Sequence, residues 1–240
     1  MARNSSAIRR RLLTLAKATV GVSVTGATGF WFWTRKCSFE EFEPETDALF
    51  SHPILSKINP WNKPESHDMC VRRVAVGEIR PELLEDAREG GSRLVEAFCA
   101  GMWGRYGFGI QRRIMTLFKD EGNKEDLWTK DDLLGSTYEP GTFMTHHFHI
   151  LEKRPQSIVF RACFSPRQTP PSPLAMDTLC ELRAEVNEEK HVVEFRMKAI
   201  TFNGLKDAPE KPDPFGGVGG WLHRQYAVLL LEAAAENCMR

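Results

Sequence analysis

Apolar and polar side chains alternate along four segments in the second half of the chain, at residues 142–151, 157–164, 174–186 and 191–201. In the last segment, Val193, Phe195 and Met197 alternate with charged residues, so the apolar side chains would share one face of an extended strand. The connections at 152–156 and 187–190 are short enough for tight turns. The pattern predicts an antiparallel meander of at least four strands with one solvent-exposed face.

Helical spacing replaces this alternation before and after the meander. Residues 69–76 predict one more short strand, and Pro81 then stands at the favoured first turn of a helix that Gly90 and Gly91 interrupt. Residues 92–118 repeat apolar side chains at helical intervals, although four glycines between 101 and 109 weaken that prediction. After a loop at 206–220 that is rich in Gly and Pro, residues 221–238 predict a long C-terminal helix. A sheet with its helices grouped on one side is an α+β arrangement.

A different pattern occupies the start of the chain. Residues 12–33 form an apolar run whose only charge is Lys17, and this length is just sufficient for a membrane-spanning helix. The first 36 residues hold seven Lys or Arg and no Asp or Glu. Trp31 and Trp33 suit the membrane interface at the end of the run. We therefore expect residues 1–36 to be a targeting segment or transmembrane anchor, with the membrane contacted through 12–33.

Three kinds of targeting segment fit this composition. Basic residues, hydroxyl residues and a lack of acids are typical of a mitochondrial presequence, which favours a single-pass protein of the mitochondrial inner membrane. A signal anchor of the endoplasmic reticulum and a segment that is cleaved or peripheral are the alternatives. Because most basic residues precede the apolar run, the positive-inside rule predicts that the globular part faces the intermembrane space or a lumen.

Charge and cysteine content narrow the class of partner. Of the 32 Lys and Arg residues, 25 lie beyond residue 36, together with all 32 Asp and Glu residues. A net-acidic body argues against nucleic acid as a partner. The six cysteines are scattered and form no C-x-x-C pair, so neither a zinc site nor a dense disulfide framework is expected.

Domain organisation follows from these patterns. An acidic stretch and three prolines at 53, 60 and 64 predict a linker or extended arm over residues 37–66, which its aromatic side chains allow to dock. Residues 67–240 then make one domain of sufficient length for its own core.

The order of strand, helical segment, meander and C-terminal helix resembles the helix-grip superfamily of START-like and Bet v 1-like proteins, which includes polyketide cyclases. Three short phrases also resemble uncharacterised helix-grip relatives: Y-E-P-G-T at 138–142, I-V-F-R-A at 158–162 and H-R-x-Y-A at 223–227. The resemblance implies a meander curled around the C-terminal helix, with an elongated apolar cavity between them. Members of the superfamily bind lipids, sterols or polyketides, cyclise polyketides, or assist assembly of membrane complexes.

We therefore expect a membrane-anchored protein that binds a hydrophobic small molecule such as a lipid, a quinone or a polyketide, with no cofactor. The predicted lining of its cavity is Met144, His146, Phe148, Phe160, Cys180, Phe195, Met197, Trp221 and Tyr226. One alternative is a cyclase or isomerase of secondary metabolism in which His146, on an otherwise apolar face, acts as acid or base. Another is an assembly factor that contacts a membrane protein.

Two further histidines, His147 and His149, would project from the opposite face of the same strand. Such a pair can chelate a metal if a third ligand converges on it, but a solvent-exposed position is the simpler interpretation. The sequence contains no G-x-S-x-G and no H-E-x-x-H motif. No metal site is therefore expected, and whether the protein is an enzyme stays open.

Overall fold

The computed structural model describes residues 29–30, 32–210 and 215–240. The chain divides into two units, residues 1–36 and residues 37–240. In the first unit, residues 29–30 and 32–34 are helical, while residues 12–28 and 31 of the predicted membrane span lie outside the described residues. Among the residues that are described, no helix combines the length and the apolar character needed to cross a bilayer. The membrane anchor therefore stays a prediction.

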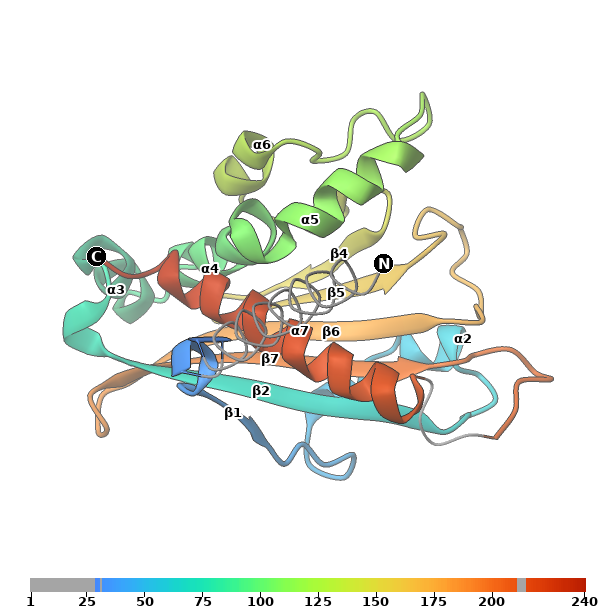
Figure 1. Cartoon of the computed structure of the whole chain (residues 1–240), viewed down its shortest axis with the longest axis horizontal. Coiled ribbons are helices and arrows are strands. Elements are labelled where there is room, and N and C mark those ends of the chain that lie inside the picture. Colours follow the sequence, from blue (N-terminus) through green and yellow to red (C-terminus); the bar gives the residue numbers. More distant parts are fainter. Residues whose placement is uncertain (1–28, 31, 211–214) are drawn as a thin grey trace, which may run out of the picture. The chain divides into compact units, whose positions relative to one another are not determined.

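The second unit is built on a seven-stranded, fully antiparallel sheet (Figure 1). Its strands are β1 (Cys37–Glu40), β2 (Glu65–Ala75), β3 (Phe143–Met144), β4 (Phe148–Lys153), β5 (Ser157–Cys163), β6 (Asp177–Asn187) and β7 (Val192–Phe202). The order across the sheet is β1-β2-β7-β6-β5-β4-β3, so β3 to β7 form a meander and β2 pairs with its last strand. The predicted meander and the α+β class are confirmed.

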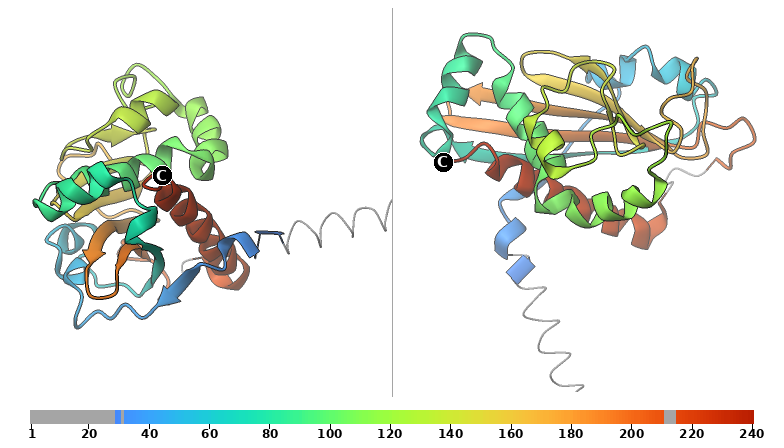
Figure 2. Two further views of the ribbon diagram at one scale, coloured as in Figure 1. Left: turned by 90° about the vertical axis from the view of Figure 1, so that its left-hand side faces the viewer. Right: turned by 90° about the horizontal axis from the view of Figure 1, so that it is seen from above.

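The main helices lie together on one face of this sheet, which we call the inner face (Figure 2). They are α3 (Pro81–Arg88), α4 (Arg93–Gly104), α5 (Tyr106–Met115), α6 (Lys130–Gly135) and α7 (Gly216–Glu236), with the short 3-10 turns η2 (Val76–Glu78) and η3 (Thr116–Phe118) beside them in the chain. Pro81 starts α3 as predicted, and Gly90, at φ +83°, follows its end. The C-terminal helix, however, begins at Gly216, so part of the predicted Gly-rich loop is helical.

The predicted helical stretch is interrupted at Arg105, between the end of α4 at Gly104 and the start of α5 at Tyr106, and two of its glycines let these helices pack closely. A Cβ added to Gly101 would lie 2.5 Å from Asn237 Cβ, and one added to Gly107 would lie 3.1 Å from Ala233 Cβ. Gly101 therefore brings α4 against α7 at a distance that only glycine tolerates, and Gly107 brings α5 against α7 at a distance that leaves little room for a larger residue. The sequence pattern showed the weak helix propensity of these residues but not the packing that compensates for it.

The outer face of the sheet is not simply solvent-exposed, which corrects the prediction from alternation. Residues 41–58, with η1 (Ala48–Ser51) and α2 (Leu55–Ile58), cover one end of it. The second hydrophobic cluster there contains Phe42, Leu49, Ile54 and Ile58 from this segment and Val159, Leu179, Ile200 and Phe202 from the sheet. On the same strands, Arg161 of β5 and Asp177 of β6 form a buried ion pair, with Arg161 Nε 3.0 Å from Asp177 Oδ1, and Arg161 also donates a hydrogen bond to the carbonyl of Ser172 at 2.9 Å. We call residues 41–58 the arm.

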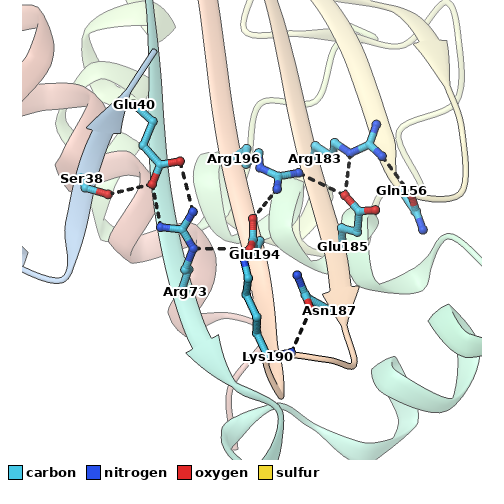
Figure 3. A network of polar contacts seen from close by, with 10 residues as sticks. All are labelled: Ser38, Glu40, Arg73, Gln156, Arg183, Glu185, Asn187, Lys190, Glu194 and Arg196. Carbon is cyan, nitrogen blue, oxygen red and sulfur yellow. Dashed lines mark hydrogen bonds and ion pairs between the residues drawn. The ribbon is translucent and has the colours of Figure 1, made fainter. Parts of the chain in front are cut away.

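The other end of the outer face carries a network of ion pairs across neighbouring strands (Figure 3). Arg73 on β2 bonds Glu40 on β1 and Glu194 on β7, at 2.6 Å and 3.4 Å. Arg196 contacts Glu194 on its own strand and Glu185 on β6, and Arg183 contacts the same Glu185. Each charged group of the predicted polar face is thus held by a neighbour of opposite sign, which stabilises the strand register.

Candidate ligand cavity

A cavity of about 260 Å³ lies between the inner face of the sheet and the helices α4, α5 and α7. Its lining is mainly apolar. The side chains of the helices are Met102 and Trp103 from α4, Phe108 and Gln111 from α5, and His223, Tyr226, Ala227 and Leu230 from α7; Phe215 precedes α7. The sheet and its loops contribute Asp68, His147, Phe148, Phe160, Ala162, Cys163, Phe164, Met176, Thr178, Cys180, Met197 and Ala199.

Small side chains on the central strands leave this space open. Phe160 pairs with Cys180, and Cys180 pairs with Ala199, so two small residues follow a large one across β5, β6 and β7. In the next row Ala162 pairs with Thr178. Farther along the sheet the row Ala184–Phe195 is filled, because Phe195 packs against Phe98 of α4 with ring centroids 4.9 Å apart. The cavity therefore lies where the sheet carries too little side-chain volume to meet the helices.

The two helices over the cavity touch at one end and separate at the other. Tyr106, at the start of α5, donates a hydrogen bond to Glu236 at the end of α7, with the two oxygens 2.9 Å apart. From that contact α5 and α7 diverge, as Figure 1 shows. One polar bridge spans the gap, between Tyr226 Oη and Gln111 Oε1 at 2.7 Å. Burial raises the pKa of Tyr226, so its phenol stays neutral and donates this bond.

A second polar group borders the cavity between β2 and α7. His223 Nε2 lies 3.3 Å from Asp68 Oδ2, and the His223 ring stacks on Phe215 with centroids 4.6 Å apart. Asp68 projects from β2 opposite Ala199 of the cavity wall. These groups can give the polar end of an otherwise apolar ligand a hydrogen-bonding or charged partner.

His147 is a further polar side chain of the wall. Its ring packs edge-to-face with Phe148 and Phe164, with centroids 4.9 Å and 5.1 Å away. Burial, and then the neighbouring His146, lower the pKa of His147 to about 4. The imidazole is therefore neutral at neutral pH, which suits an apolar wall.

The predicted strand over residues 142–151 is wrong, and this changes the place of His146. The segment folds into a hairpin in which Met144 pairs with Phe148, and Thr145 and His146 form its turn at φ +48° and +57°. The carboxylate of Asp126 accepts a hydrogen bond from the His146 backbone N–H at 2.8 Å, which stabilises this uncommon conformation. The turn places His147, and not His146, in the cavity wall.

Five of the nine predicted lining residues border the cavity: Phe148, Phe160, Cys180, Met197 and Tyr226. Met144 and Phe195 are fully buried in the core beside it, and His146 lies in the turn. Trp221 is 60% exposed on the outer side of α7. The contributions of α4 and α5 were missed, although the helical spacing of Phe108 and Gln111 would have placed both on one face.

Within residues 29–30, 32–210 and 215–240, His147 and His149 are not part of a metal-binding group. His149 stacks on Phe143, with ring centroids 4.2 Å apart, and burial together with Arg161 and Arg167 lowers its pKa. Among the residues that the structure describes, no group of three or more His, Cys, Asp or Glu side chains is arranged to hold a metal ion. All six cysteines are free thiols, and five of them are buried.

Comparison with known proteins adds no family to these observations. No protein-family model, no curated protein and no solved structure matches this chain.

Proposed function

We propose that this protein binds a hydrophobic small molecule, such as a lipid, a quinone or a polyketide, in the cavity beneath α5 and α7. The observation that carries the proposal is the cavity itself, which is apolar over most of its wall and holds a few polar groups near α7. Its volume of about 260 Å³ lies just under the range of about 300–1,000 Å³ typical of small-molecule sites. It would therefore hold one small apolar ligand, or one chain or ring of a larger ligand.

The neutral state of the polar wall supports the same proposal. His147 and Tyr226 are uncharged at neutral pH, so entry of an apolar ligand does not strip water from a charged imidazole or phenolate. The paired Asp68 and His223 form the polar end. This division suits an amphiphile, whose polar group would meet the pair while its apolar part enters under Tyr226.

The proposal extends to fold family and location. A meander, an inner-face cavity and a long C-terminal helix support a helix-grip protein of the START-like or Bet v 1-like kind. The basic, acid-free residues 1–36 support an anchored protein, with the mitochondrial inner membrane favoured over the endoplasmic reticulum. An anchor would keep the cavity near the bilayer in which such ligands dissolve.

Two other functions stay hypotheses. A cyclase or isomerase would now depend on His147, since this histidine borders the cavity. An assembly factor would act through its surface and would need no bound ligand.

Native mass spectrometry of the full chain, purified in detergent from its source, tests the proposal. We expect a bound mass that is lost in Ala162→Phe, because Ala162 is a partly exposed residue of the cavity wall. Ala75→Phe, at the exposed end of β2, is the matched control and should retain the ligand. A wild-type chain that carries no ligand and takes up no lipid or quinone would contradict the proposal. Release of a modified product would favour the enzyme.

A further inference from the structure

The outer side of α5 and η3 exposes an apolar stripe to solvent. Ile110 is 77% exposed, Ile114 51%, Leu117 81% and Phe118 55%. These residues recur at spacings of three and four, so they lie on one side of the helix, while Phe108 and Gln111 point into the cavity. A row of large exposed apolar side chains is unusual for a protein that is surrounded only by water.

The first turns of α7 expose a second apolar group, formed by Val218, Trp221 and Leu222. The same stretch of α7 sends His223 and Tyr226 into the cavity. Of the helices that border the cavity, α5 and α7 therefore each have an inner side facing the cavity and an outer apolar side facing solvent. We call the seven exposed residues the α5–α7 surface.

Positive charge flanks the apolar stripe of α5 and η3. Residues 105–119 contain four bases, Arg105, Arg112, Arg113 and Lys119, and no acid. The body of the protein is otherwise acidic, with 25 basic against 32 acidic residues beyond residue 36. Arg105, Arg112, Arg113 and Lys130 also line a shallow depression beside Ile110. Acidic side chains begin only at Asp120, whose carboxylate accepts hydrogen bonds from the backbone of Gly122 and Asn123.

We propose that the α5–α7 surface is a membrane-docking surface that inserts its aliphatic side chains and Trp221 into the interface of an anionic bilayer. A helix with an apolar side and flanking Arg and Lys residues lies in this way at the boundary of headgroups and acyl chains. Anionic lipids attract the bases, and Trp is favoured at the interface. This inference deepens the proposed function, because it directs α5 and α7 toward the bilayer that would supply the hydrophobic ligand. It rests on the proposed function only for the existence of that ligand.

Photo-cross-linking of the full chain in vesicles tests this surface. The chain is reconstituted in phosphatidylcholine alone and in phosphatidylcholine mixed with phosphatidylserine, each with a lipid that carries a diazirine near its headgroup. We expect adducts on peptides that contain residues 106–119 and 216–224, and more of them with phosphatidylserine. Ile114→Glu combined with Leu117→Glu should reduce labelling of both segments about tenfold, because both apolar side chains leave the interface.

Two further variants make the result specific. Arg113→Glu combined with Lys119→Glu keeps the apolar stripe and should abolish the preference for phosphatidylserine. Trp61→Glu is the matched control, since Trp61 is 52% exposed but follows α2 on the opposite face of the sheet, and its labelling pattern should equal that of the wild type. Circular dichroism establishes that each variant is folded.

Three outcomes would overturn the docking surface: adducts confined to residues 12–33, equal labelling in both kinds of vesicle, or cross-links that join the α5–α7 surfaces of two copies of the chain. Failure here is separable from failure of the proposed function. If the chain retains its ligand but lacks these adducts, only the docking surface is contradicted. If the chain is labelled but never holds a ligand, only the proposed ligand binding is contradicted.

Discussion

Single residues set the chemistry of this cavity by their position relative to one turn. Thr145, His146 and His147 are three consecutive polar residues. The hairpin gives each of them a different environment. Thr145 is fully buried, His146 is held by Asp126, and His147 borders the cavity. A shift of one residue in the turn would exchange the histidine in the wall.

The pKa of His147 predicts how stability depends on pH. Between the folded pKa of about 4 and the unfolded value of about 6.5, the unfolded chain binds a proton at this residue and the folded chain does not. The free energy of unfolding therefore falls as pH is lowered through this window, by up to about 1.4 kcal/mol per pH unit. Denaturant titrations of wild type and His147→Gln measure it. The wild type should lose stability relative to the variant below pH 6.5, and parallel curves would exclude this role.

The buried ion pair of Arg161 and Asp177 makes a second prediction at this scale. Asp177→Asn leaves the guanidinium buried without a counter-charge and should lower the free energy of unfolding by about 3–5 kcal/mol. Chemical denaturation measures this loss. Glu188→Gln removes one partner of the exposed pair with Arg88 and should have no measurable effect. If both variants lost a similar free energy of unfolding, burial of the ion pair would not be the cause of the loss in Asp177→Asn.

Among the elements, close packing of α4 and α5 on α7 depends on glycine. Gly101 lies against the backbone and Asn237 at the C-terminal end of α7, whereas an added Cβ at Gly109 meets nothing within 4 Å beyond its chain neighbours and the backbone of its own helix. The two glycines have the same helix propensity, so the difference between them belongs to tertiary packing alone.

Replacement of each glycine by alanine separates these effects. Gly101→Ala should lower the free energy of unfolding by about 1–3 kcal/mol, because α7 must move away. Gly109→Ala should raise it by about 0.5–1 kcal/mol through better helix propensity. Thermal unfolding of the two variants gives the sign. Stabilisation by both substitutions would show that α7 is not held closely at Gly101.

For the domain of residues 37–240 as a whole, the arm acts as a second layer on the outer face of the sheet. Phe42 packs against Phe50 and His67, with ring centroids 4.7 Å and 5.5 Å away, and closes the second hydrophobic cluster. The arm is part of residues 37–66, which were predicted as a linker or extended arm, and the structure shows which of its apolar residues are buried. Its contacts cover Val159, Leu179, Ile200 and Phe202 of the sheet.

Truncation of one arm residue tests this covering role. Phe42→Ala should lower the free energy of unfolding by about 3–5 kcal/mol, as expected for a buried phenylalanine. Limited proteolysis should then cut within residues 41–58 more readily. Trp61→Ala, at a side chain that is 52% exposed, should leave both measurements nearly unchanged. An unchanged Phe42→Ala variant would mean that the arm contributes little to stability.

The sequence by itself determined the α+β class, the meander and the helix at Pro81, because a period of two or 3.6 residues and turn residues are local properties of the chain. It also indicated five residues of the cavity wall, since strand alternation assigns a face to Phe148, Phe160, Cys180 and Met197 and helical spacing assigns one to Tyr226. Alternation does not predict the reversal of the chain at Thr145 and His146, because this turn depends on Asp126, 20 residues earlier. It equally does not report which polar positions another segment covers.

Only the tertiary structure decided where the cavity lies. It forms because Cys180 and Ala199 meet across neighbouring strands while α5 and α7 diverge above them, and both facts join residues that are distant in the chain. The exposed stripe of α5 has the same origin: helical spacing gives two apolar sides to this helix, and only packing determines which of them is buried. Periodicity fixes the direction of a side chain within its own element, whereas its surroundings depend on elements far along the sequence.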